Sequence, residues 1–218
     1  DVDLAVQAGT VHGIVGENGA GKSTLMSLLY GLYPADSGEI AVFGRTVHLR
    51  NAHDAIALGV GMVHQHFMLV DTLSALDNIV LGAEPHWLLR PAAAQARARL
   101  EPLMRSTGLQ VPLDATVADL AVGDRQRLEI LKALYRGARI LILDEPTAVL
   151  TPQETVQLFE VLRQLRAQGS TVILITHKLK EVMALCDRVT VMRAGRVVQD
   201  APIGQVDIAS LEIGRAHV

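Results

Sequence analysis

The sequence predicts an α/β fold with a mostly parallel central sheet, and two observations support this. Short apolar, β-branched runs alternate with segments of helical periodicity, a pattern typical of a parallel sheet covered by helices on both faces. Hydrophobic residues make up 50% of the 218 residues, enough for a folded chain with a sizeable core. No apolar run approaches the roughly 18 residues that a membrane-spanning helix needs. The net charge of −3 gives no positive field that would recruit nucleic acid.

Strands and helices can be assigned to particular segments. The six strand-like segments are VHGIVG (11–16), EIAVFG (39–44), VGMVHQ (60–65), RILILD (139–144), STVILIT (170–176) and DRVTVMRAG (187–195). Helices are expected to follow Lys22, Pro91, Asp124, Pro152 and Lys178. The helix after Pro152 is the best defined, because apolar residues recur from Leu158 to Leu165 at the i, i+3, i+4, i+7 spacing. Thr151 and Glu154 provide its N-cap and its capping-box acid.

The chain reads as a single α/β domain over residues 1–212. The strand pattern disappears over about residues 67–137, where we predict an inserted helical subdomain. The first residues, DLAVQAG, have the pattern of a strand cut in its middle, so we expect the natural domain to begin further upstream. The last six residues, IGRAHV (213–218), continue no preceding pattern and match one reading frame of a common sequencing adapter. We therefore expect a non-native tail there, which sequencing of intact DNA would test.

The segment GENGAGKST (16–24) predicts a phosphate-binding loop. It fits the pattern G-x-x-x-x-G-K-[ST] and lies between an apolar strand-like run and an apolar helix-like run. Glycines let such a loop curl until its N–H groups converge on phosphate oxygens, and the following helix adds its positive N-terminal end. The lysine of the pattern reaches the β- and γ-phosphates, and the serine hydroxyl ligates Mg²⁺. The predicted binding residues are Gly16, Asn18, Gly19, Ala20, Gly21, Lys22, Ser23 and Thr24, with Ser23 also a metal ligand.

Two acids end the apolar run RILILDEPT (139–147). A buried parallel strand would deliver Asp144 beside the phosphate loop, where it can hold Mg²⁺. Glu145 would then be placed to orient or deprotonate an attacking water. The alternative is an acidic turn that only caps a strand. The phosphate loop on the same chain favours the catalytic interpretation, and with it hydrolysis of a nucleotide.

Together with three further motifs, these residues resemble the ATP-binding cassette (ABC) ATPases over residues 10–200. LAVGDRQR (120–127) occupies the place of the family signature, Gln65 that of the Q-loop glutamine, and His177 that of the switch histidine. The resemblance implies a P-loop NTPase fold with antiparallel β pieces, a helical signature subdomain, and ATP and Mg²⁺ as cofactors. It also implies that Gln65 touches Mg²⁺ or the attacking water and that His177 contacts the γ-phosphate, as catalytic residues beside Glu145.

The resemblance also divides each ATP site between two cassettes. In the family, two ATP molecules are sandwiched between the phosphate loop of one cassette and the signature of the other. Ala121, Gly123 and Asp124 would thus bind, in trans, ATP that a second cassette holds. The aromatic residue that stacks on adenine in the family would lie upstream of residue 1.

Four residues depart from the family pattern, one of them Val122, which replaces the first glycine of the signature. The usual signature is LSGGQ, and Ala121 lacks the serine hydroxyl that helps to bind the γ-phosphate. Thr151 stands where the loop after DEPT normally ends in aspartate. Asp124 places a carboxylate where phosphates should bind and would repel them. We predict that it turns aside, toward the ribose or toward Arg125 or Arg127.

Subfamily features indicate an importer. The segments MVHQHFMLV, LKALYRGAR and DEPTAVLTPQE resemble the first cassette of double-cassette ATPases that power simple-sugar and nucleoside importers. This implies an ATP-hydrolysing subunit that is peripheral on the cytoplasmic face of the cell membrane. Its partners would be a second cassette, transmembrane permeases, of which a coupling helix docks near residues 66–82, and indirectly a substrate-binding protein. Nucleic acid is not an expected partner.

Two other functions compete with this one. A low-turnover regulatory nucleotide-binding cassette would explain Ala121 and Thr151, although the residues of a competent half-site are all present. A soluble ABC protein acting on ribosomes or DNA is disfavoured, because the sequence has no basic patch and no long inserted arm. His64 and His66 flank Gln65 and form a weak candidate for a metal pair.

Overall fold

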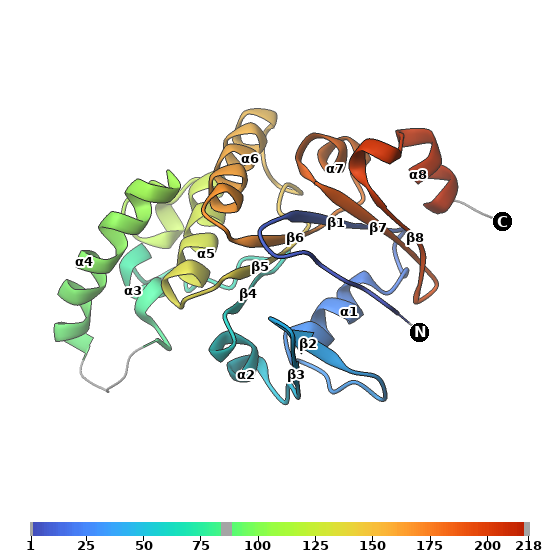
Figure 1. The fold of residues 1–218 in the computed structure, drawn as a ribbon. Helices are drawn as coiled ribbons and strands as arrows, with labels where there is room; N and C mark the ends of the chain where they lie inside the picture. The colour runs from blue at the N-terminus through green and yellow to red at the C-terminus, as the bar shows by residue number, and fades with distance from the viewer. Residues whose placement is uncertain (1, 84–88, 216–218) are drawn as a thin grey trace.

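A computed structural model describes residues 2–83 and 89–215 (Figure 1). Its main sheet has six strands in the order β4-β5-β6-β1-β7-β8. The pairs from β4 to β7 are parallel, and β8 returns antiparallel to β7. A separate antiparallel pair is formed by β2 and β3. The strands are β1 (Val11–Val15), β2 (Ile40–Val42), β3 (Arg45–Val47), β4 (Val60–Val63), β5 (Ile140–Asp144), β6 (Thr171–Ile175), β7 (Arg188–Arg193) and β8 (Arg196–Pro202). The predicted fold class is confirmed.

Helices cover both faces of this sheet, with α6 and α7 on one face and α1 on the other (Figure 1). The helices are α1 (Lys22–Leu29), α2 (Ala52–Ala57), α3 (Ala75–Val80), α4 (Leu89–Thr107), α5 (Val122–Tyr135), α6 (Pro152–Ala167), α7 (Leu179–Leu185) and α8 (Ile208–Arg215), with 3₁₀ turns at Val117–Asp119 and Ile203–Gln205. Within the described parts of the chain, none of the helices is long and apolar enough to cross a membrane.

Alternation along the strands builds a core on each side of the sheet. In β5, Leu141 and Leu143 belong to the core shared with α5 and α6, whereas Ile142 belongs to the core shared with α1. All three side chains are almost fully buried. Because successive strand residues point to opposite faces, a continuous apolar run is what a strand covered on both faces requires.

The helices α3, α4 and α5 lie together at one end of the sheet (Figure 1). Between residues 67 and 137, the described residues contain no strand; their β pairing is one isolated bridge, from Ser74 to Thr116. Buried leucines such as Leu100 on α4 and Leu128 on α5 join this region to the main core. The signature segment therefore stands on a helical layer that packs continuously against the sheet.

Several predicted element boundaries need correction. DLAVQAG forms no strand. Val2, Leu4 and Val6 pack on the α1 side of the core, but this segment does not pair with a strand among the described residues. Helices α4 and α5 begin at Leu89 and Val122, earlier than predicted. Proline is tolerated in a first turn, and the extended backbone of Ala121 provides the N-cap position of α5.

Short or exposed elements were absent from the prediction, namely β3, β8, α2 and α8. The chain also continues as helix α8 to Arg215, while residues 216–218 of the expected tail lie outside the described residues. The predicted cap of α6 is confirmed: Thr151 Oγ1 accepts the Glu154 N–H, and the Glu154 carboxylate accepts the Thr151 N–H at 2.8 Å.

Candidate functional site

A cavity of about 380 Å³ opens where four neighbouring parallel strands end. The phosphate loop follows β1, Gln65 follows β4, Asp144 and Glu145 end β5, and His177 follows β6. The carboxyl edge of a parallel sheet is where such folds bind ligands. The cavity is lined by Asn18, Gly19, Ala20, Gly21, Lys22, Ser23, Thr24, Gln65, Asp144, Glu145, Ala148 and His177. These include every residue predicted for the ATP site outside the signature, with the exception of Gly16, which is buried.

The phosphate loop is shaped by glycines that no other residue could replace without strain. A Cβ on Gly16 would lie 2.5 Å from the carbonyl oxygen of Met192, a clash with backbone. Gly21 has φ +95° and precedes the first residue of α1, a conformation that favours glycine. The loop thus turns tightly into the N-terminus of α1, whose first residues, Lys22, Ser23 and Thr24, line the cavity.

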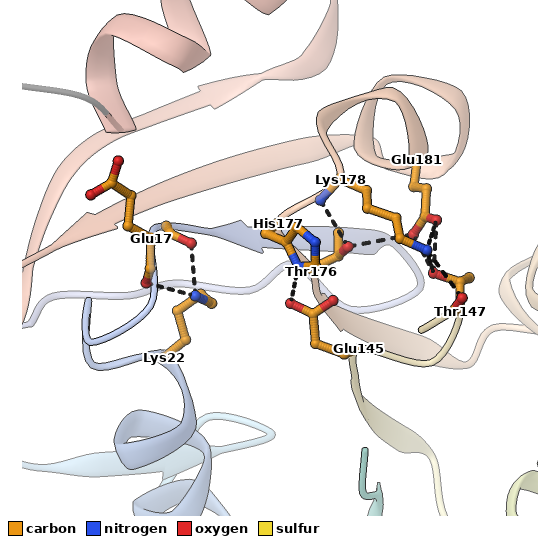
Figure 2. A network of polar contacts seen from close by, with 9 residues as sticks. Glu17, Lys22, Glu145, Thr147, Thr176, His177, Lys178 and Glu181 are labelled. Atoms are coloured by element: carbon orange, nitrogen blue, oxygen red, sulfur yellow. Dashed lines mark hydrogen bonds and ion pairs between the residues drawn. The ribbon is translucent and has the colours of Figure 1, made fainter. Parts of the chain in front are cut away.

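Lys22 is folded back across its own loop (Figure 2). Its Nζ donates hydrogen bonds to the carbonyl oxygens of Gly16, at 2.7 Å, and Glu17, at 3.0 Å. The residue is 8% exposed, so these contacts compensate for burying its charge. The loop is therefore organised around the ammonium group before any phosphate binds.

Glu145 and His177 contact each other (Figure 2), and both line the cavity. The His177 Nδ1 atom lies 2.8 Å from Glu145 Oε1. Glu145 has φ +48°, an uncommon left-handed conformation for a non-glycine residue, and its N–H donates to the Ile175 carbonyl at 2.9 Å. Its other oxygen, Oε2, is buried and accepts no hydrogen bond from the described residues. One carboxylate oxygen is thus fixed by the histidine, and the other has no hydrogen-bond partner among the described residues.

Asp144 provides the second carboxylate of the site. Burial raises its pKa, and so does the charge of Glu145, whereas the charges of His64 and Lys22 lower it. Two adjacent carboxylates in a partly buried site are stabilised by a cation. Asp144 and the Ser23 hydroxyl are oxygen donors of the kind that Mg²⁺ accepts beside its retained waters. The donor set therefore fits Mg²⁺ held together with phosphates.

A metal site built from protein groups alone has no comparable support. Among the described residues, no three histidine, cysteine or acidic side chains come together as a metal-binding group. His64 instead packs edge-on against the Tyr30 ring, at 6.1 Å between ring centroids, and it lines a different cavity. His66 is exposed.

A buried polar network behind the site escaped the sequence analysis (Figure 2). Thr147 Oγ1 lies 2.7 and 2.8 Å from the two carboxylate oxygens of Glu181. Lys178 Nζ donates to the Thr147 carbonyl at 3.0 Å and lies 3.3 Å from Glu181. The network joins the loop after Glu145 to the loop after His177. The i, i+3 spacing of Lys178 and Glu181 in the sequence predicts that these two side chains pair on a helix. It does not predict the contact of either residue with Thr147.

The signature residues Ala121, Gly123 and Asp124 lie apart from this cavity, at the start of α5. Asp124 Oδ1 accepts a hydrogen bond from Arg127 at 2.7 Å, so the predicted contact with a basic neighbour is confirmed. The Gly123 N–H donates to Glu154 Oε1 on α6 at 3.2 Å. The signature residues therefore do not share a cavity with the phosphate loop of their own chain.

Known proteins with this combination of motifs are similar over nearly the whole chain. The guanosine import ATP-binding protein NupO of Bacillus subtilis is 50% identical over 218 residues, which is 99% of this chain and 43% of that protein. The ribose import ATP-binding protein RbsA 1 of Burkholderia thailandensis is 47% identical, over 96% of this chain and 42% of its own length. The chain thus spans less than half of these relatives.

Comparison of structures and of family patterns gives a concordant result. A solved structure from Clostridium perfringens, part of the ABC transporter complex cbiONQ, aligns with TM-score 0.81 at 28% identity, covering 96% of this chain and 84% of that one. The ABC transporter family pattern matches residues 1–148, which include the phosphate loop, Gln65, the signature and the two acids of β5. The chain therefore belongs to the ABC transporter family.

Proposed function

We propose that this chain is the ATP-binding and ATP-hydrolysing cassette that energises a membrane ABC importer. The observation that carries the proposal is the pairing of Glu145 with His177 at 2.8 Å, in the lining of a cavity that the phosphate loop also lines. In this arrangement, Glu145 would serve as a carboxylate base and His177 would contact the γ-phosphate in the same site. The import ATP-binding relatives support the same activity.

Binding begins with the phosphate loop. Its N–H groups and the N-terminus of α1 hold the β- and γ-phosphates. Lys22 exchanges the carbonyl oxygens of Gly16 and Glu17 for phosphate oxygens. Hydrogen bonds to a charged acceptor are shorter and stronger than those to a neutral carbonyl. The exchange therefore favours the nucleotide while the loop keeps its shape.

Hydrolysis depends on Glu145 and its neighbours. Glu145 Oε2 accepts no hydrogen bond from the described residues. In this proposal, it accepts a proton of the water that attacks the γ-phosphorus. His177 fixes Oε1 and contacts the γ-phosphate, and ADP is the leaving group. Ser23, Asp144 and Gln65 would hold Mg²⁺, which when bound neutralises charge on the phosphates. The buried contact of Thr147 with Glu181 keeps the two catalytic loops in register.

The complete ATP site needs a second cassette, either on the same full-length chain or on a dimer mate. In this proposal, the start of α5 offers Ala121, Gly123 and Asp124 to the ATP that the second cassette holds. Val122 and, on α6, Val156 are 40% and 60% exposed. Exposed apolar side chains beside this half-site suit a protein interface. Closure of the sandwich around two ATP molecules couples binding to movement of the membrane subunits.

The permease docks beside the Q-loop in this proposal. Met68 and Leu81 follow Gln65 along the chain and are 63% and 45% exposed. Met68 also lines a cavity of about 190 Å³ between β4 and α5. Glu129 accepts the Met68 N–H at 2.6 Å, and Lys132 donates to the Met68 carbonyl at 2.9 Å. These contacts fix the segment after Gln65, so that movement of a docked helix reaches the ATP site.

The cargo is proposed to be a nucleoside or a simple sugar, because the named relatives import guanosine and ribose. A substrate-binding protein would deliver it from the other side of the membrane. The cassette itself would be peripheral on the cytoplasmic face. In this proposal, the permeases and the substrate-binding protein contact the cargo, and the cassette binds ATP.

ATP turnover by the full-length protein assembled with its permeases tests this proposal. We expect Glu145→Gln to bind ATP normally and to lower turnover by about 10²-fold or more, the usual effect of removing a general base. Lys22→Ala should instead weaken ATP binding. Absence of turnover in the intact wild-type transporter would favour a regulatory cassette, and co-purification with ribosomes or DNA would favour a soluble ABC protein.

A further inference from the structure

The N–H that the signature would offer to a phosphate is already engaged. The Gly123 N–H donates to Glu154 Oε1 at 3.2 Å, and a Cβ on Gly123 would lie 2.5 Å from the same oxygen. The Ala121 carbonyl accepts the N–H groups of Asp124 and Arg125, each at 3.0 Å. A carboxylate therefore sits at the N-terminus of α5, where an anion is favoured.

Glu154 is held in this position by the start of its own helix. Its second oxygen, Oε2, accepts the Thr151 N–H and the Thr151 hydroxyl, both at 2.8 Å. These two hydrogen bonds lower its pKa most, and the hydrogen bond from Gly123 and the charge of Arg127 lower it further. Glu154 thus remains an anion throughout the neutral range of pH.

The same two helices are joined at a second point. Arg127, which is paired with Asp124 at 2.7 Å, also contacts Gln157 on α6. The start of α5 and the start of α6 are therefore linked through Glu154 and Gln157. The residue that accepts the Gly123 N–H is thus also the residue that caps α6, next to the loop that follows Glu145.

We propose that Glu154 is a positioning residue that occupies the Gly123 N–H until the γ-phosphate of the opposite cassette displaces it. The inference rests on the proposed function, because it requires that Gly123 binds phosphate in trans. One N–H cannot donate well to both anions, and two anions at one helix end repel each other. Closing the ATP sandwich therefore includes breaking this contact, which opposes closure at low ATP concentration.

The test uses the full-length protein with its permeases, in the Glu145→Gln background, so that ATP closes the sandwich without being consumed. Fluorescence transfer between probes on the two cassettes gives the ATP concentration at half-maximal closure. Glu154→Gln keeps a side chain suited to a capping box but removes the charge. Glu154→Asp keeps the charge but shortens the reach. Glu160→Gln, on the exposed face of α6, is the matched control.

Both Glu154 variants should lower the ATP concentration at half-maximal closure by about fivefold, the size of effect expected when a charged acceptor is lost or replaced by a neutral one. Glu160→Gln should not change it. ATP binding to the phosphate loop of the isolated chain should be the same in all variants. An unchanged or higher midpoint in the Glu154 variants overturns the inference. Failure of Glu145→Gln itself to close with ATP would instead contradict the proposed function.

Discussion

At the scale of single residues, the site is organised by hydrogen bonds that hold its charged side chains in place. Lys22 is held by carbonyl oxygens of its own loop, and Glu145 is held by His177. The left-handed backbone of Glu145 is the kind of local strain that persists where the surrounding structure fixes it. Preorganised groups of this sort lose little freedom in the reaction.

The pairing of His177 with Glu145 predicts a defect in chemistry rather than in binding. His177→Ala should lower ATP turnover by about 10²-fold, because the carboxylate loses the group that orients it. The half-saturating ATP concentration should change little, since Lys22 and the loop N–H groups remain. Steady-state kinetics of the complete transporter measure both quantities. A large rise in that concentration with normal turnover would show that His177 serves binding instead.

His12, on the central strand β1, gives the fold a dependence on pH. It is fully buried, and its Nε2 lies 2.7 Å from Thr190 Oγ1. Burial lowers its pKa, an effect that Asp200 partly opposes and that Arg188 reinforces. His12 therefore binds a proton near pH 6.5 in the unfolded chain but only at lower pH in the folded chain. As a result, the free energy of unfolding falls as the pH drops below about 6.5.

The measurement is urea unfolding of the isolated chain at pH 7.5 and 5.5. The free energy of unfolding of the wild type should fall by up to about 1.4 kcal/mol per pH unit because of His12. His12→Gln keeps a polar side chain, and its free energy of unfolding should fall correspondingly less over the same interval. Equal pH dependence in the two proteins would exclude this role. Replacement of the exposed His53 by Gln is the matched control and should behave as the wild type.

At the scale of elements, the catalytic loops after β5 and β6 are tied together by side chains that are 34 positions apart. Thr147 is 1% exposed and Glu181 is 9% exposed, and the threonine hydroxyl reaches the Glu181 carboxylate. A buried carboxylate without its donor is costly. The network therefore stabilises the fold and aligns Glu145 with His177 at the same time.

Thr147→Val tests this network, because it preserves shape and removes the hydroxyl. We expect a loss of about 1–3 kcal/mol in the free energy of unfolding and a lower ATP turnover. Thr147→Ser retains a donor and should recover most of both. Chemical denaturation and ATPase kinetics provide the two readouts. If valine at this position gave wild-type stability and turnover, the network would have neither role.

The sequence predicted the elements that are buried, periodic and long. All strands of the parallel sheet were found because apolar runs such as ILIL and VILI are required where both faces are covered. The strand β8 was missed because its exposed edge position mixes polar residues into the pattern. Strand β3 has three residues, which is too few for a period to be visible.

Motif spacing predicted most of the residues that line the cavity, because a parallel sheet brings its strand ends together. It could not predict the contact between Gly123 and Glu154 or that between Thr147 and Glu181. These pairs are 31 and 34 residues apart, and they meet only through the packing of helices against the sheet. Contacts of this kind depend on tertiary structure and leave no periodic signal.

At the scale of the whole molecule, the proposed function gives the chain two half-sites that face different partners. The phosphate loop, Asp144, Glu145 and His177 surround one cavity, while the signature lies at the start of α5 outside it. In the proposed function, a single cassette holds ATP without completing the ATP site. The proposed function accordingly requires a second cassette for turnover and permeases for transport.

ATP-driven uptake into proteoliposomes that contain the complete transporter tests the central claim most directly, with labelled guanosine and labelled ribose as the probes. We expect uptake of one of them by the wild type and by Glu160→Gln. We expect Glu145→Gln to lower that uptake by about 10²-fold or more, although ATP still binds. Uptake by Glu145→Gln at the wild-type rate would contradict the claim that hydrolysis at this site drives import.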